Sequence, residues 1–165
     1  MKKTITNIIV AGLGGQGVLK STDILAEALF REGNDVKKSE LHGMSQRGGS
    51  LKSDVRFGEN VFSPMIGEGE ADYLLVLTPD QVEVNQHWLS AHGQLLTPEG
   101  INPSDLPHPK SVNVCMLGIL DAWLALSEES WKQALQANLP APILEKNWNS
   151  FLMGKSMGEE CYGKV

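Results

Sequence analysis

Apolar residues follow two different periods over the first forty positions. Residues 5–11 include three consecutive apolar positions (8–10), which is typical of a strand covered on both faces in a parallel sheet. After a glycine-rich loop, apolar side chains recur at helical spacing over residues 18–29, and Gly33 ends that helix. Residues 35–40 then predict a second, shorter and more polar strand. This order predicts a βαβ unit with the dimensions of a mononucleotide-binding half-domain.

The chain departs from that pattern after the second strand. A loop with three glycines, LHGMSQRGGS at residues 41–50, stands where the standard fold has a second crossover helix. Residues 51–57 and 60–63 alternate between apolar and polar positions on either side of Gly58-Glu59. Alternation across a glycine-containing turn predicts a β-hairpin inserted after the second strand.

The middle of the chain predicts two further strands with a helix between them. Residues 71–77 (ADYLLVL) have the composition of a buried strand, and residues 94–97 predict a short one. Between them a helix opens at Asp80, which stands at capping-box spacing from Glu83, and Gly93 ends it.

The last third of the chain is predicted to be helical. A proline-rich connector leads to residues 112–126, which are apolar on nearly all faces and therefore predict a core helix. Ser127 caps the next helix, and a proline pair introduces the last one. The fold class is α/β: a Rossmann-like three-layer variant with a mainly parallel sheet, a β-hairpin insertion after the second strand and a helical C-terminal third. We expect a single domain over residues 1–155 and a frayed tail over residues 156–165.

Charge and cysteine content exclude several classes of protein. The net charge of −6 argues against nucleic acid as a partner, because phosphate recognition needs basic stripes. No apolar run approaches the roughly 20 residues that span a bilayer, and we expect no cleavable leader before the first strand. We therefore expect a cytoplasmic protein with no membrane partner. Cys115 and Cys161 are too few for a disulfide framework or for the four thiolates of an iron–sulfur cluster, and we expect no metal site on this chain.

A GxGxxG spacing lies directly after the first strand, in AGLGGQGVLKS at residues 11–21. Its glycines are Gly12, Gly14 and Gly17, and Gly15 is a fourth. The helix that follows points free amides and the positive end of its dipole at this loop, so an anion is the expected occupant. Glu40 lies near the end of the second strand, roughly where an acid would hold a ribose hydroxyl. Two interpretations stay open: a dinucleotide site, or glycines that serve only strand–helix packing.

A second glycine-rich loop brings polar side chains to the same region. Its residues are His42, Gly43, Gln46, Arg47, Gly48 and Gly49. Because loops after parallel strands leave the carboxyl edge of a sheet, the two glycine loops should converge there. An arginine fork, a histidine and backbone amides make an anion or phosphate pocket. The alternative is that Arg47 pairs with a local carboxylate and the glycines only form the entry to the hairpin.

The sequence contains no recognisable group of catalytic residues. Neither a Ser/His/Asp nor a Cys/His arrangement can be recognised, and the diphosphate-plus-magnesium signature of thiamine enzymes is missing. Asp121 stands alone in an apolar helix, where a capped or interface carboxylate is expected rather than a catalyst. We therefore assign no catalytic residue and expect the chain to be part of a larger assembly.

Several motifs, in order, resemble one family over nearly the whole chain. They are GLGGQG at residues 12–17, HGMSQRGG at 42–49, GEGEADYLL at 67–75, NVCMLG at 113–118 and KNWNSFLMG at 146–154. Together they are similar to the gamma-type subunit or domain of 2-oxoacid:ferredoxin oxidoreductases, the family of the pyruvate, 2-ketoisovalerate, 2-oxoglutarate and indolepyruvate enzymes. The HGMSQRGG form is most similar to the indolepyruvate type, whose small subunit is a single domain.

The resemblance implies an assembly that oxidatively decarboxylates a 2-oxoacid on thiamine diphosphate. Its electrons pass through iron–sulfur clusters to ferredoxin, and the product is usually an acyl-coenzyme A. Thiamine diphosphate, its Mg ion and the clusters then belong to partner subunits, so this chain is expected to bind none of them and to be inactive alone. By the same resemblance, the loops at Gly12–Gly17 and His42–Gly49 face the subunit interface or coenzyme A.

Two other functions remain alternatives: a free-standing NAD(P)- or FAD-binding oxidoreductase, and a nucleotide-binding regulatory module. The predicted hairpin argues against the free-standing oxidoreductase, because it would occupy the place where the adenosine half of the dinucleotide binds. The subunit hypothesis predicts an apolar interface patch, for which Met44, Met65 and Ile66 are the candidates. An isolated chain that exposes such a patch is expected to form a homodimer as a substitute.

Overall fold

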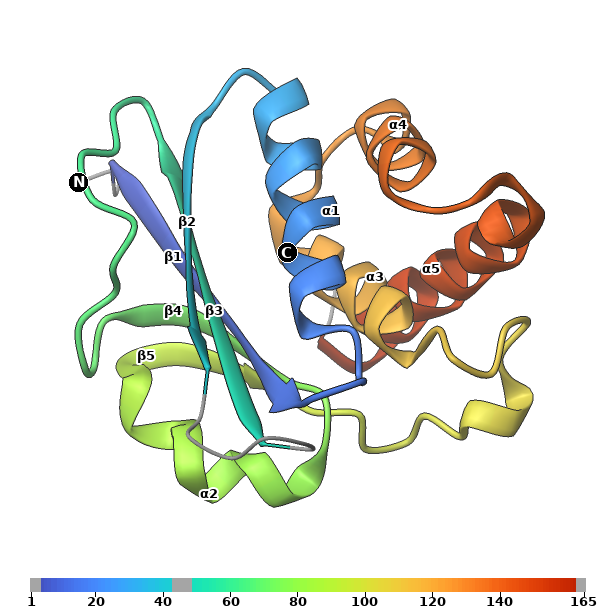
Figure 1. The fold of residues 1–165 in the computed structure, drawn as a ribbon, viewed down its shortest axis with the longest axis horizontal. Coiled ribbons are helices and arrows are strands. Elements are labelled where there is room, and N and C mark those ends of the chain that lie inside the picture. Colours follow the sequence, from blue (N-terminus) through green and yellow to red (C-terminus); the bar gives the residue numbers. More distant parts are fainter. Residues whose placement is uncertain (1–3, 43–48, 163–165) are drawn as a thin grey trace.

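The structure, a computed structural model, describes residues 4–42 and 49–162. Within these residues a five-stranded sheet forms the centre, and the long helices lie on one side of it (Figure 1). The strands are β1 (Ile5–Leu13), β2 (Asp35–His42), β3 (Ser50–Gly58), β4 (Ala71–Val76) and β5 (Leu89–Leu96). The helices are α1 (Val18–Arg31), α2 (Val82–Asn85), α3 (Val112–Leu124), α4 (Glu128–Asn138) and α5 (Ala141–Tyr162). Short 3₁₀ turns are η1 (Pro79–Gln81), η2 (Gln86–Trp88) and η3 (Pro103–Asp105).

The sheet is mixed because one inserted strand, β3, runs antiparallel to both of its neighbours. Its order is β2-β3-β1-β4-β5, and the pairs β1–β4 and β4–β5 are parallel. β3 is antiparallel to both β1 and β2, so β2 runs in the same direction as β1 although β3 lies between them. The predicted α/β class, the mainly parallel strand direction and the antiparallel insertion after the second strand are confirmed.

The inserted strand pairs with β2 and β1 rather than with residues 60–63, which form no strand. Side chains hold the backbone of that segment instead. The amide of Val61 donates to Asp35 Oδ2 at 2.7 Å, and the carbonyl oxygen of Ser63 accepts from Arg56 Nη1 at 2.7 Å. Because these bonds take up the backbone groups that a ladder would need, the predicted hairpin between residues 51–57 and 60–63 is wrong.

An apolar layer covers each face of the sheet. On the helical face, β1, β3 and β4 pack against α1, α3, α4 and α5 around the fully buried Trp131 and Phe151. The opposite face is covered by residues 59–70 and 79–88, which we call the outer layer, and Trp88 lies in its apolar cluster. Ile66, an expected interface residue, is only 3% exposed and belongs to this cluster, so that expectation is wrong. Met44 lies outside the described residues.

Glycines let α3 and α5 pack with their backbones in contact. A β-carbon at Gly154 would overlap the carbonyl oxygen of Cys115, and one at Gly118 would overlap that of Phe151. Gly158 continues the contact one turn further along α5, opposite the carbonyl oxygen of Ile119. The apolar composition that predicted a core helix over residues 112–126 is therefore explained by burial between the sheet and α5.

The predicted helix from Asp80 to Gly93 is much shorter in the structure. Residues 79–88 form only single turns, and β5 begins at Leu89. The N-cap of the first turn is Thr78, without a side-chain capping bond, so the predicted capping box does not form. Gly93 lies inside β5, where a β-carbon would stand 2.6 Å from the carbonyl oxygen of Ala71. Pairing with β4 overrides the local helical pattern here.

The C-terminal helices agree with the prediction at their start and extend past it at their end. Ser127 is the N-cap of α4, and its hydroxyl accepts from the amide of Ser130 at 3.2 Å. α5 continues through Tyr162, beyond Ser156 where a frayed tail was expected, and Met157 packs against the core. Among the described residues, none of the helices has the length and hydropathy to cross a membrane.

Candidate functional site

Two left-handed glycines shape the loop between β1 and α1. Gly15 and Gly17 have φ values of 86° and 82°, and Gly17 is the N-cap of α1. Inside the turn, the Gln16 side chain fills the space that a β-carbon at Gly12 would need. Its Oε1 accepts from the amide of Leu13 at 2.7 Å. The loop is therefore closed by its own glutamine, while the first amides of α1 have no partner within the helix.

The two glycine loops meet at the carboxyl edge of β1. The amide of Gly14 donates to the carbonyl oxygen of Gly49 at 3.1 Å, directly beyond the last paired residues of β1 and β3. Arg47 and Gly48 lie outside the described residues, and of His42 only the backbone at the end of β2 is described. The expected convergence of the loops is thus visible at Gly49, whereas an anion pocket built on Arg47 stays a prediction.

Glu40 does not stand beside the glycine loop. Across the sheet it is paired with Ser53 of β3, whose partner on β1 is Val10. Since neighbouring strands lie about 4.8 Å apart, the insertion of β3 separates Glu40 from β1 by about 10 Å. Its carboxylate binds Lys38 Nζ at 2.9 Å. The sequence spacing that suggested a ribose-binding acid therefore does not bring that acid to the loop.

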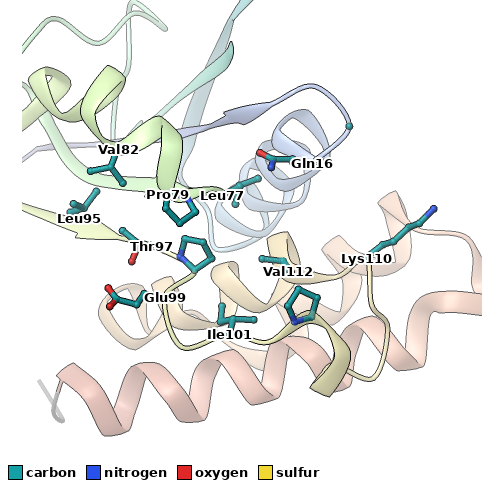
Figure 2. A pocket seen from close by; sticks show the side chains of 13 residues that line it. Gln16, Leu77, Pro79, Val82, Leu95, Thr97, Glu99, Ile101, Lys110 and Val112 are labelled. Atoms are coloured by element: carbon teal, nitrogen blue, oxygen red, sulfur yellow. The ribbon is translucent and has the colours of Figure 1, made fainter. Parts of the chain in front are cut away.

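A cleft of about 1070 Å³ opens beside the loop, at the carboxyl ends of β1, β4 and β5 (Figure 2). It is lined by Gly15, Gln16, Leu77, Pro79, Val82, Leu95, Thr97, Pro98, Glu99, Ile101, Pro103, Lys110 and Val112. Most of these side chains are aliphatic or proline. Figure 2 shows Gln16 and Glu99 beside this apolar lining, and Lys110 at one end of it with its amine pointing away from the other side chains. Open α/β sheets bind their ligands at this edge, so the cleft is the candidate site.

Only the glycine-loop wall of this cleft was predicted from the sequence. The other walls follow β4 and β5 or belong to the connector that leads to α3. Two signals were present in the sequence: positions directly after buried strands, and a connector dense in proline at residues 98–109. Neither signal says which loops fold toward each other, because that depends on the sheet order.

A smaller pocket of about 260 Å³ adjoins the cleft at the N-terminus of α1 and shares Gly15, Gln16 and Lys110 with it. Lys20 and His108 also line this pocket. Lys20 Nζ donates to the carbonyl oxygen of Asn138 at 3.1 Å. Cationic side chains and the positive end of α1 therefore adjoin the otherwise apolar cleft.

Asn113 fixes the start of α3 against the glycine loop. Its Nδ2 donates to the carbonyl oxygen of Gly17 at 3.3 Å, and a β-carbon at Gly17 would stand 2.5 Å from the same nitrogen. The N-termini of α1 and α3 are thereby held together beside the smaller pocket. The glycine loop serves packing as well as forming part of the cleft wall.

Asp121 and Cys115 are structural rather than chemical groups in this geometry. Asp121 Oδ1 accepts from Trp131 Nε1 at 2.8 Å and from the amide of Leu126 at 2.9 Å, so it caps the end of α3 as expected. Burial raises the pKa of this carboxyl above its ordinary value. Burial likewise raises the pKa of the Cys115 thiol to about 11, which keeps it protonated. In residues 4–42 and 49–162, no group of three His, Cys, Asp or Glu side chains could hold a metal ion.

Comparison with known proteins gives a consistent set of relatives. The family model for pyruvate ferredoxin/flavodoxin oxidoreductase matches residues 7–107. The indolepyruvate oxidoreductase subunit IorB of Thermococcus kodakarensis is 28% identical over 197 aligned residues, which cover 95% of this chain and 98% of that one. The 2-oxoglutarate synthase subunit KorC of Archaeoglobus fulgidus is 29% identical, and the alignment covers 92% of this chain and 87% of that one.

Solved structures share the fold at low sequence identity. The gamma subunit of a keto/oxoacid ferredoxin oxidoreductase from Geobacter sulfurreducens superposes with a TM-score of 0.81 at 23% identity, over 96% of this chain and 98% of that one. The 2-oxoglutarate:ferredoxin oxidoreductase from Magnetococcus marinus, with 2-oxoglutarate, coenzyme A and succinyl-CoA bound, gives a TM-score of 0.87 at 20% identity. That match covers 99% of this chain and 32% of the longer polypeptide, so the same fold occurs there as one part of a larger chain.

Proposed function

This chain belongs to the pyruvate ferredoxin/flavodoxin oxidoreductase family, and from that premise we propose that it is the gamma-type, non-catalytic subunit of a 2-oxoacid:ferredoxin oxidoreductase. Relatives named as indolepyruvate oxidoreductase subunits match it over nearly their whole length, which supports an aromatic 2-oxoacid as substrate of the complex. The assembly would decarboxylate the 2-oxoacid on thiamine diphosphate in the cytoplasm and pass the electrons to ferredoxin.

The observation that carries this proposal is the position of β3. A dinucleotide-binding half-domain places its second strand beside the first, so that an acid on it reaches the ribose. Here β3 separates them, Glu40 is bound to Lys38, and Gln16 closes the glycine loop from within. The same edge holds an apolar cleft instead. These features favour a surface that faces an active site shared with partner subunits. They argue against a self-contained NAD(P) or FAD site and against a nucleotide-binding regulatory module.

The cofactors of such an assembly fit partner subunits better than this chain. An iron–sulfur cluster takes four thiolates, whereas the chain has two cysteines, one buried in α3 and one exposed near the end of α5. We therefore assign thiamine diphosphate, its Mg ion and the clusters to partners. Coenzyme A, where it is the acyl acceptor, would pass the edge formed by Gly12–Gly17, His42–Gly49 and the cleft. Lys20 and Lys110 would hold its phosphates there by charge.

Co-purification under anaerobic conditions tests the proposal. The tagged chain is produced together with the catalytic subunits of the same assembly, and the eluate is assayed for thiamine, iron and 2-oxoacid-dependent reduction of ferredoxin. We expect activity from the complex with indolepyruvate above 2-oxoglutarate and pyruvate, and none from the isolated chain. Stoichiometric binding of NAD(P) or FAD by the isolated chain, with no complex formed, would overturn the proposal in favour of a free-standing oxidoreductase.

A further inference from the structure

The charges of this chain are unevenly distributed along its sequence. Residues 57–109 contain eight Asp and Glu residues and neither Lys nor Arg, so all 14 basic residues lie outside this segment. The segment supplies β4 and β5, the connector from β5 to α3, and the whole outer layer, which lies on the side of the sheet away from α1, α4 and α5 (Figure 1). The outer layer is therefore built from a stretch of chain that has carboxylates but neither Lys nor Arg.

The carboxylates of the outer layer point to solvent. Glu59, Glu68, Glu70, Asp80 and Glu83 are all exposed, and in the part of the chain that the structure describes none of them pairs with Lys or Arg. The cations of β3 on this face are already engaged: Arg56 donates to Asn7 Oδ1 at 2.9 Å and to the carbonyl oxygen of Ser63 at 2.7 Å. Lys52 is buried, bonded to Asp54 at 2.6 Å and stacked on Trp88 at 3.9 Å from the ring centre.

Three large apolar side chains stand in this acidic surface: Phe62 and Met65 on one segment, and Val84, which is 53% exposed, in α2. The side chain of Phe62 is 94% exposed and that of Met65 is 63% exposed. Exposed apolar residues gathered on one segment of a soluble protein are typical of an interaction site. Met65, one of the expected interface residues, is thus on the surface beside a phenylalanine that sequence reasoning did not select.

The segment that carries Phe62 is firmly attached to the sheet on both sides of it. Val61 is buried, and its amide donates to Asp35. Ile66 is buried, and its amide donates to Asp54 Oδ2 at 3.0 Å. Because the backbone is already ordered, little conformational entropy remains to be lost when the phenyl ring is covered, which is the property of a binding anchor.

We propose that the outer layer is the docking surface for the catalytic partner subunit, with Phe62 as its apolar anchor. This inference rests on the proposed function. The partner surface has an apolar socket for the ring, and it carries Lys and Arg side chains that match the five exposed carboxylates of the outer layer. A second copy of this chain is a poor occupant, because it would bring the same carboxylates against one another. Anionic partners such as nucleic acids are disfavoured for the same reason.

The geometry separates Phe62 from the cleft, although Pro79 and Val82 of the outer layer also line the cleft. Gly58 is paired with Ile5, at the amino end of β1, so Phe62 follows shortly after the end of the sheet opposite to the glycine loop. Nine residues of extended strand span roughly 30 Å. A partner anchored on Phe62 can therefore leave the carboxyl edge free to face a shared active site.

Binding of the full chain to the purified catalytic subunit tests the docking surface. Phe62→Ser is expected to raise the dissociation constant about 30-fold, the size of effect found for an interface hot spot. The matched control is Phe30→Ser: Phe30 is 68% exposed on α1, on the opposite side of the sheet, and should change the constant less than twofold. Glu68→Lys combined with Glu70→Lys should slow association and weaken its dependence on salt.

The outcomes separate the two proposals. Thermal unfolding of Phe62→Ser should match wild type, because its ring is exposed, so a loss of binding cannot come from a loss of folding. A wild-type complex that tolerates Phe62→Ser as well as Phe30→Ser overturns the docking surface and leaves the proposed function intact. If the wild-type chain forms no complex with a catalytic subunit, both proposals are overturned.

Discussion

At the scale of single residues, the glycine loop shows that two glycines one residue apart can be required for different reasons. Gly15 and Gly17 both adopt a left-handed backbone conformation, which an L side chain enters at a cost of roughly 1–2 kcal/mol. Around Gly15 there is open space, whereas Gly17 faces Asn113. Only Gly17 therefore has a packing role in addition to its conformational one.

The first prediction compares alanine at these two positions. Gly15→Ala should lower the free energy of unfolding by about 1 kcal/mol, from backbone strain alone. Gly17→Ala should lower it by about 3 kcal/mol, because the methyl group also displaces Asn113 from its bond to the Gly17 carbonyl. Urea unfolding of both variants gives the difference. Equal losses would mean that Asn113 moves aside freely and does not fix the loop.

Asp121 gives a residue-scale prediction about pH. Burial raises its pKa in the folded chain above the unfolded value of about 3.9, so the folded state holds its proton more tightly. Its contribution to stability is then greatest below that pH and declines as pH rises through the folded pKa. Measured by urea unfolding, the stability of wild type relative to Asp121→Asn should fall between pH 4 and pH 7. A difference that rises with pH would show that the bonds from Trp131 and Leu126, or Lys155 at 3.4 Å, outweigh burial.

At the scale of elements, the contact between α3 and α5 depends on residues that have no side chain. Gly154→Ala would place a methyl group on the carbonyl oxygen of Cys115, and backbone atoms cannot move aside as a flexible side chain can. We expect a loss of about 3 kcal/mol despite the better helix propensity of alanine. Ser156→Ala, at an exposed position of the same helix, should change stability by less than about 0.5 kcal/mol. Chemical denaturation of both variants is the measurement, and a stabilised Gly154→Ala protein would contradict the close approach of the two helices.

The elements that sequence reasoning predicted well are those whose signals are local. The run of apolar residues in β1, the helical spacing of α1 and the Ser127 cap each lie within a few positions of the element they define. The start of β5 at Leu89 was missed because its strand state comes from pairing with β4, about twenty residues earlier in the chain. The hairpin partner of β3 was missed for a similar reason: Asp35, 26 residues earlier, takes the Val61 amide. The cleft is the extreme case, since its walls come from four separate segments.

At the scale of the whole molecule, the carboxyl edge of the sheet and the outer layer differ in chemistry, although Pro79 and Val82 belong to both. The carboxyl edge has an apolar cleft with Lys20 and Lys110 beside it, whereas the outer layer is acidic and carries Phe62. A subunit without its own catalytic set needs both a place to attach and a place to face the reaction. If the two tasks are divided in this way, variants of the two surfaces should change different constants of the same complex.

The last prediction uses that division. In the assembled complex, Lys110→Glu should raise the KM for an anionic acyl acceptor or 2-oxoacid about tenfold, because it reverses a charge shared by the cleft and the smaller pocket. Affinity for the catalytic subunit should stay within twofold of wild type. Lys132→Glu makes the same change in net charge on α4, away from the cleft, and should leave KM unaltered. Steady-state kinetics and a binding titration on the same preparations give both constants. An unchanged KM for Lys110→Glu would show that ligands do not pass the cleft, and a loss of subunit affinity would show that the carboxyl edge itself is the docking surface.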